Sequence, residues 1–222
     1  MRDAWFTPLL AGANFRDRIV ACLGAMIGIG ITAAISAAFV GSSTGLPLLV
    51  APMGASAVLL FAVPASPLAQ PWPVIGGNVI SALVGLAVVQ LVPDWRLAAA
   101  IAVAAAILVM SVLRCLHPPG GAAALLPVLG GAAIREAGLG FALAPVGLNA
   151  ALLVAVGLLF HRLSGHSYPH RPAPLEAAED PRFRPEDVDA ALTELGETFD
   201  VAREDLDRLF QAAERHASLR RS

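Results

Sequence analysis

A nine-residue stretch at positions 114–122 holds the side chains best suited to chemistry. It reads Arg-Cys-Leu-His-Pro-Pro-Gly-Gly-Ala and lies between two long apolar runs. Arg114 brings a full positive charge, which is costly at membrane depth unless it faces a cavity or a partner. His117 brings an imidazole that can donate a hydrogen bond or carry a proton. The cation, the imidazole and the two helix-stopping prolines together indicate a polar site inside an apolar region.

A second stretch, at positions 52–60, resembles the first. Its sequence Pro-Met-Gly-Ala-Ser-Ala-Val-Leu-Leu aligns with Pro-Pro-Gly-Gly-Ala-Ala-Ala-Leu-Leu at positions 118–126, with a proline, a glycine, an alanine and both leucines matching. Each stretch follows an uninterrupted apolar run and precedes a run with an asparagine near its start, Asn78 or Asn149. Proline- and glycine-interrupted segments at corresponding positions of two halves are the best sequence pointer to a transport site.

The backbone at these two breaks favours an anion. A helix that begins at a proline leaves its first N–H groups without intrahelical partners, and its dipole places partial positive charge there. Pro52, Pro118 and Pro119 are therefore predicted to break the apolar runs and to start short helices. The residues predicted to bind the anion are Gly54, Ala55, Ser56, Asn78, Arg114, His117, Gly120, Gly121, Ala122 and Asn149.

The composition predicts an integral membrane protein in contact with a lipid bilayer. The 222 residues are 57% hydrophobic and 14% charged, against about 25% charged residues in soluble domains. We expect a transmembrane domain at 1–172 and a cytoplasmic helical tail at 173–222, because charges are sparse before position 160 and dense after position 172. The net charge of −2 gives no basis for a nucleic-acid partner.

The apolar runs predict an all-α integral membrane fold in two internal repeats. Two arrangements fit: four full transmembrane helices plus two broken or re-entrant segments, or six crossings of which two are broken. Broken crossings make the halves inverted, whereas re-entrant segments make them parallel. The full spans, each long enough for about 30 Å of hydrocarbon, are expected at 19–40, 76–92, 97–113 and 143–160, with a proline-rich loop at 65–73.

Basic residues flank the first and last spans. Arg16 and Arg18 precede the first, and Arg162 and Arg171 follow the last. The positive-inside rule then places both termini in the cytoplasm of a multi-pass protein of the inner, or cell, membrane. Gly24 and the glycine four residues later form a GxxxG step, which permits close helix packing within the chain or in a homo-oligomer.

Other chemistries find little support. The chain contains no lysine, which excludes a P-loop ATPase, and no serine elbow or pair of intramembrane carboxylates is present. His161, His166 and His170 follow the last span without an accompanying carboxylate or cysteine, which disfavours a metal site. We expect no enzyme activity, no cofactor and no metal.

The polar tail is predicted to contain two helices. The first is expected to begin at Pro185, with Val188, Leu192 and Leu195 on one side. The second is expected to be capped by Asp200.

The residues around His117 also carry a family resemblance. The stretch 113–122 resembles the signature of the HPP family of integral membrane proteins, and 54–61 with 66–71 and 76–78 resembles the other typical block of that family. The resemblance covers about residues 15–162. It implies four transmembrane segments, and it implies nitrite transport, in which plant and cyanobacterial members are implicated. The tail resembles the linker that leads into a CBS domain pair in bacterial members, but the given sequence stops at Ser222, before such a module.

Two functions are therefore expected. The first is a membrane transporter or channel for a small monovalent anion, nitrite by the resemblance, with Arg114 attracting the anion and His117 gating it or carrying a coupled proton. The alternative is a membrane sensor or scaffold that conducts nothing and signals through its helical tail.

Overall fold

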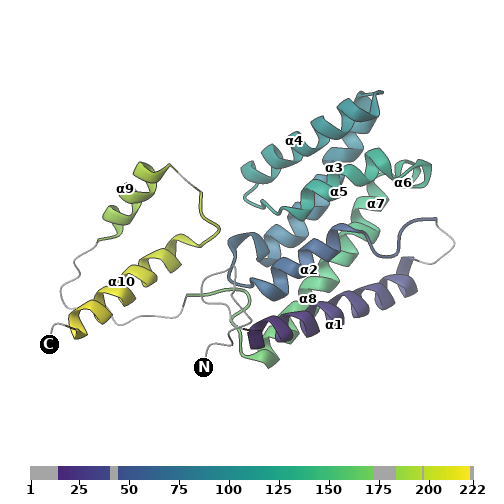
Figure 1. Cartoon of the computed structure of the whole chain (residues 1–222). Helices are drawn as coiled ribbons and strands as arrows, with labels where there is room; N and C mark the ends of the chain where they lie inside the picture. The colour runs from purple at the N-terminus through teal and green to yellow at the C-terminus, as the bar shows by residue number, and fades with distance from the viewer. Residues whose placement is uncertain (1–14, 41–44, 173–183, 197, 221–222) are drawn as a thin grey trace.

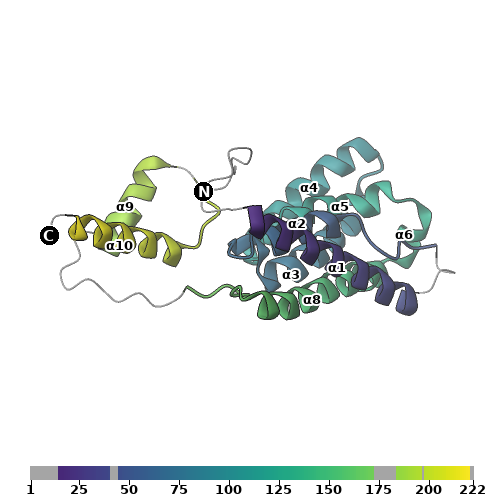
Figure 2. The ribbon, with the colours of Figure 1, turned by 60° about the horizontal axis from the view of Figure 1, so that its bottom comes forward.

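The computed structural model describes residues 15–40, 45–172, 184–196 and 198–220, and these residues contain helices but no strands. The expected domain boundary at 172–173 falls at the edge of one of these ranges. Figures 1 and 2 show a helical bundle with two further helices beside one end. The bundle helices are α1 (Phe15–Val40), α2 (Pro52–Ala62), α3 (Pro71–Leu91), α4 (Trp95–Val112), α5 (Pro119–Leu129), α6 (Ala132–Ala137), α7 (Leu139–Phe141) and α8 (Leu148–Ser164).

In the part of the chain that the structure describes, four helical segments are long and apolar enough to cross a membrane. They are α1, α3, α4 and the segment from Leu139 to Ser164, in which α7 and α8 are joined across a kink where Ala144 leaves the helical conformation. The short helices α2 and α5 have 11 residues each, or about 16 Å at 1.5 Å per residue. The predicted all-α membrane fold with four spans and two shorter segments is confirmed.

Each short helix completes a passage from one end of the bundle to the other. We call the end where α1 begins the proximal end and the opposite end the distal end. Just before α2, the Val50 amide bonds to Asn149, whose own amide reaches Ser36 in the distal half of α1. At the other end of α2, Phe61 packs against Gly24, nearer the start of α1. The segment from Gly45 to Ala62 therefore runs antiparallel to α1, as a broken crossing.

The second short helix runs in the opposite direction. Gly120 packs beside Gly77 near the start of α3, and Ala124 packs beside Gly85. The indole N–H of Trp72, in the first turn of α3, donates to the Leu113 carbonyl at 3.2 Å. Residues 113–129 thus pass from the proximal end toward the distal end, parallel to α3. Of the two predicted arrangements, the geometry favours six crossings, with α1–α2–α3 and α4–α5–α8 as inverted halves.

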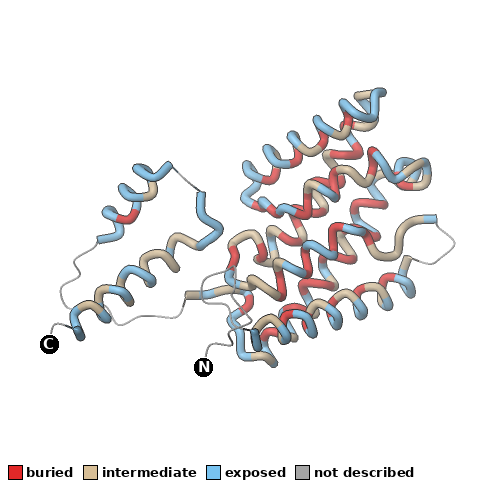
Figure 3. Tube along the Cα trace, in the orientation of Figure 1, coloured by how far each residue is buried: buried red, intermediate tan, exposed pale blue. Residues whose placement is uncertain are grey.

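Small residues allow the helices to pack closely. The buried face of α1 consists of Ala21, Gly24, Gly28, Thr32 and Ser36. A methyl group at Gly24 would lie 2.5 Å from the Phe61 ring, so only glycine permits this approach of α2. Figure 3 shows that buried residues follow the inward faces of the bundle helices, while the outward faces of α1 and α4 are exposed and apolar, as lipid contact requires.

Two local predictions were wrong. Positions 71–73 belong to the first turn of α3 and not to a loop, because prolines are tolerated there, where their missing N–H groups would have no partner. Asp200 does not cap the second tail helix. That helix, α10 (Arg203–Leu219), begins after Ala202 without a side-chain cap, whereas the first, α9 (Pro185–Leu195), begins at Pro185 as predicted.

Candidate functional site

The prolines place the two short helices as predicted. α2 begins at Pro52, and α5 begins at Pro119 with Pro118 as its N-cap residue. Their first N–H groups are not free, however. The amides of Met53 and Gly54 donate to the carbonyls three residues earlier, at 3.0 and 3.1 Å. The amides of Gly120 and Gly121 form the same 3₁₀-type bonds at the start of α5. The dipoles remain, but the donors of a site must come mainly from side chains.

Three buried side chains meet where α2 approaches the start of α5. We call Ser56, Asn78 and His117 the inner polar cluster. They come from α2, from α3 and from the turn before α5, and all three are fully buried. Ser56 Oγ lies 2.8 Å from His117 Nε2, and Asn78 Nδ2 donates to Ser56 Oγ at 3.3 Å. Sequence positions far apart, all predicted to bind the anion, thus form one polar site.

The hydrogen bonds assign the protons of the neutral cluster. His117 Nδ1 lies 2.8 Å from the carbonyl oxygen of Leu68, which can only accept, so Nδ1 carries the proton. Nε2 is then an acceptor, and the Ser56 hydroxyl donates to it. Asn78 donates to both Ser56 Oγ and the Val74 carbonyl. Its own Oδ1 has no hydrogen-bond partner, which leaves one buried acceptor open in the cluster.

Asn149 lies in a separate polar contact. Its Oδ1 accepts from the Val50 amide at 2.9 Å, and its Nδ2 donates to Ser36 Oγ and to the Leu48 carbonyl. It therefore secures the non-helical approach to α2. Asn78 and Asn149 occupy corresponding positions of the inverted halves, but only Asn78 belongs to the inner polar cluster.

Arg114 lies two residues after the end of α4 and is exposed to the surroundings of the bundle. Its backbone adopts the left-handed conformation with φ of 55°, which is uncommon for a residue other than glycine. The amides of Arg114 and Cys115 bond back to the carbonyls of Ser111 and Met110, which is the Schellman arrangement of a helix end. The guanidinium thus lies at the proximal end and outside the inner polar cluster.

The small residues predicted at the site divide between two environments. Gly54, Ala55 and Ala122 are exposed on the outer faces of α2 and α5, and a methyl group added at Gly54 would meet nothing within 4 Å. Gly120 is buried, and a methyl group there would lie 3.0 Å from the Gly77 carbonyl oxygen and 2.7 Å from Ser81 Oγ. Gly121 is partly buried beside Val103 of α4. Gly120 therefore serves the close packing of α5 on α3.

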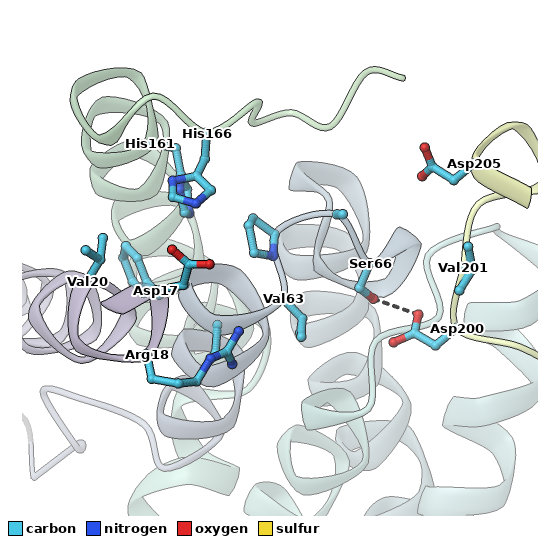
Figure 4. A pocket seen from close by; sticks show the side chains of 14 residues that line it. Asp17, Arg18, Val20, Val63, Ser66, His161, His166, Asp200, Val201 and Asp205 are labelled. Carbon is cyan, nitrogen blue, oxygen red and sulfur yellow. Dashed lines mark hydrogen bonds between the residues drawn. The ribbon is translucent and has the colours of Figure 1, made fainter. Parts of the chain in front are cut away.

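A pocket at the proximal end was not predicted. It has a volume of about 600 Å³ and lies between the start of α1, the end of α2, the end of α8 and the segment before α10 (Figure 4). His161 lines it and is buried, with Nε2 2.8 Å from the Leu60 carbonyl oxygen and Nδ1 without a hydrogen-bond partner. Arg18, Ser66 and Asp200 also line it. The sequence offered one pointer, the histidines after the last span.

Comparisons with known proteins agree on the class of this chain. The family model described as "HPP, transmembrane region" matches residues 11–169. Two proteins of Dictyostelium discoideum described as transmembrane proteins are 38% identical over 127 residues and 37% identical over 114 residues. These matches cover 55% and 50% of this chain but only 44% and 36% of the relatives, so the chain spans less than half of their length. No solved structure shows a significant match. Because the family model covers most of the chain, and the matched region contains the inverted halves and the inner polar cluster, the chain belongs to the HPP family of transmembrane proteins.

Proposed function

We propose that this protein transports a small monovalent anion across the membrane through the inner polar cluster, and that it is not an enzyme. The cluster offers a hydroxyl, an imidazole and a primary amide, with no carboxylate among its three members. The hydroxyl and a protonated imidazole can donate hydrogen bonds to an anion, whereas the single open acceptor, Asn78 Oδ1, is too few for a cation site. Nitrite is the first anion to test, because the family resemblance implies it.

The bond between Ser56 and His117 is the observation that carries this proposal. In the neutral cluster the Ser56 hydroxyl donates to Nε2, so it cannot donate to an anion. When His117 takes up a proton, Nε2 becomes a donor to Ser56 Oγ, and the hydroxyl hydrogen is released. The released hydroxyl and the positive imidazolium then favour an anion together. The cluster thereby links binding of one anion to uptake of one proton.

The inverted halves supply a route for the movement. In transporters built from inverted repeats, the site lies between the repeats and one half rocks against the other. Ser56 and Asn78 belong to the first half, and His117 belongs to the second. A rocking motion would therefore open the Ser56–His117 contact. Arg114, exposed where α5 is about to begin, would draw anions to the proximal end.

Uptake by the purified protein in liposomes tests the proposal. Nitrite, nitrate, formate and chloride would be supplied with and without an inward proton gradient. We expect Ser56→Ala and His117→Ala to lower nitrite uptake by about 10- to 100-fold, the equivalent of a lost hydrogen bond to a charged group. His216→Ala removes an exposed histidine of the tail and should leave uptake unchanged.

The role of Arg114 needs its own pair of variants. Arg114→Ala should abolish nitrite uptake while the protein stays folded. Arg114→Gly removes the same charge but suits the left-handed backbone at this position. An equal loss of nitrite uptake in both variants would assign the effect to the guanidinium group and not to the backbone. Normal uptake by either folded variant would refute the proposed attraction.

The alternative function, a sensor or scaffold acting through the tail, has one supporting observation. The tail contacts the bundle through two hydrogen bonds, one from Ser66 to Asp200 and one between His170 Nε2 and Asp205 Oδ2, each at 2.7 Å. A folded protein that carries none of the four anions under either gradient would favour this alternative over transport.

A further inference from the structure

A carboxylate of the tail begins a series of hydrogen bonds that leads to the inner polar cluster. Asp200 lies in the segment before α10, 134 residues after Ser66 in the sequence. The Ser66 hydroxyl donates to Asp200 Oδ1 at 2.7 Å, as the dashed line in Figure 4 shows. Ser66 is almost fully buried, so this contact joins the tail to the interior of the proximal end and not to its outer surface.

One residue, Leu68, forms hydrogen bonds with both Ser66 and His117. Ser66 Oγ accepts from the Leu68 amide at 3.1 Å, as the N-cap of the short 3₁₀ turn η2 (Pro67–Ala69). The carbonyl of the same Leu68 accepts from His117 Nδ1 at 2.8 Å. The position of Leu68, and with it the acceptor of the imidazole proton, therefore depends on the Ser66 side chain.

The residues that follow Leu68 are held by the segment after α8. The Tyr168 hydroxyl donates to the Ala69 carbonyl at 3.0 Å, and the His170 amide donates to Gln70 Oε1 at 2.8 Å. Gln70 in turn donates to the carbonyls of Pro64 and Ser66. The segment after α8 thus fixes the two residues that follow Leu68, while Asp200 fixes the residue that precedes the turn.

We propose that Asp200 is a positioning residue for His117: the tail carboxylate, acting through Ser66 and Leu68, holds the imidazole in the form with its proton on Nδ1. A charged acceptor makes the stronger kind of hydrogen bond, so the Ser66 hydroxyl is kept directed at the tail and its lone pairs at the Leu68 amide. When Asp200 is removed, the Ser66 hydroxyl loses the acceptor that directs it and can turn away from the Leu68 amide, so the Leu68 carbonyl is no longer held in place opposite Nδ1–H. The proton can then move to Nε2, where the Ser56 oxygen accepts it.

Nitrogen NMR of the histidines measures this directly. The full chain, labelled with ¹⁵N-histidine and held in lipid nanodiscs, contains five histidines, and the His117 signals are those missing from His117→Gln. We expect Asp200→Ala to raise the ratio of Nε2–H to Nδ1–H in His117 about tenfold, as the loss of one net hydrogen bond implies. Ser66→Ala should do the same, because it removes the contacts to both Asp200 and Leu68.

Asp207→Ala is the matched control. It removes a carboxylate from the same tail, but Asp207 pairs with Arg203 of its own helix and has no contact with Ser66. This variant should leave the His117 signals unchanged. Unchanged His117 signals in Asp200→Ala, or equal changes in Asp200→Ala and Asp207→Ala, would overturn the positioning role. The measurement requires no transport, so it holds or fails independently of the proposed function.

Discussion

Replacement of Gly85 by alanine tests how closely the two halves pack. An ideal methyl group at Gly85 of α3 would lie 2.9 Å from the carbonyl carbon of Ala124 in α5, and closer still to the carbonyl oxygen. Favourable contacts between heavy atoms lie at about 3.5–4.0 Å, and the carbonyl oxygen is the closer obstacle, so the helices would have to separate by about 1 Å or more. The obstacle is backbone, which cannot rotate away as a side chain can.

The expected cost of Gly85→Ala is about 1–3 kcal/mol, the usual range for overpacking a well-packed core. Gly30→Ala is the control, because a methyl group at Gly30 of α1 meets nothing within 4 Å. Alanine is favoured over glycine inside a helix by about 0.8–1.0 kcal/mol, so this variant should be neutral or stabilised. Both variants replace a helical glycine by alanine, but Gly85→Ala is expected to lower the stability and Gly30→Ala is expected to leave it unchanged or raise it.

Equilibrium unfolding in mixed micelles, with an increasing fraction of sodium dodecyl sulfate and tryptophan fluorescence as the readout, measures both variants. The detergent fraction at which half of the protein is unfolded should fall for Gly85→Ala and should stay the same or rise for Gly30→Ala. Equal midpoints for the two variants would show that α3 and α5 do not approach as closely as described, and the direction assigned to α5 would lose its main support.

Two further predictions concern the polar contacts. Asn149→Ala should lower stability by about 2–5 kcal/mol in the same unfolding assay, because it removes the partner of the buried Val50 amide and of the part-buried Leu48 carbonyl. A loss below 1 kcal/mol would contradict this. Burial raises the pKa of Tyr168 well above its ordinary value of about 10. Its contribution to stability is therefore full below pH 10 and is lost as the pH rises toward the folded-state pKa. Because Tyr168 is the sole tyrosine, absorbance at 295 nm should show no phenolate near pH 10 in the folded protein, and ordinary titration there would refute its burial.

The sequence predicted the helix breaks well because proline acts locally. Pro52 and Pro119 begin helices wherever the surrounding chain lies, since the ring fixes φ and removes a donor. The same rule explains the difference at Pro71, because prolines predict a loop when they are dense but are also tolerated in the first turn of a helix, where α3 places them. The local sequence therefore predicts which helices exist more reliably than it predicts the residues at which they begin and end.

The candidate site was only partly predictable. Ser56, Asn78 and His117, each a polar residue in an apolar run, do lie together in the structure, while their binding of an anion stays a prediction. Asn149 and Arg114 were grouped with them by spacing, but spacing does not say which side of a helix faces the partner. The contact of Asp200 with Ser66 spans 134 residues, and no local pattern could have indicated it.

The contact between Asn149 and Val50 also has a consequence for biosynthesis. The non-helical approach to α2 exposes backbone amides and carbonyls that lipid cannot satisfy. Its stabilising partner, Asn149, is 99 residues further along the chain. At synthesis rates of about 5–20 residues per second, that partner emerges about 5–20 s later. The first broken crossing therefore cannot settle in its final form as it leaves the ribosome, and its assembly waits for the last helix of the bundle.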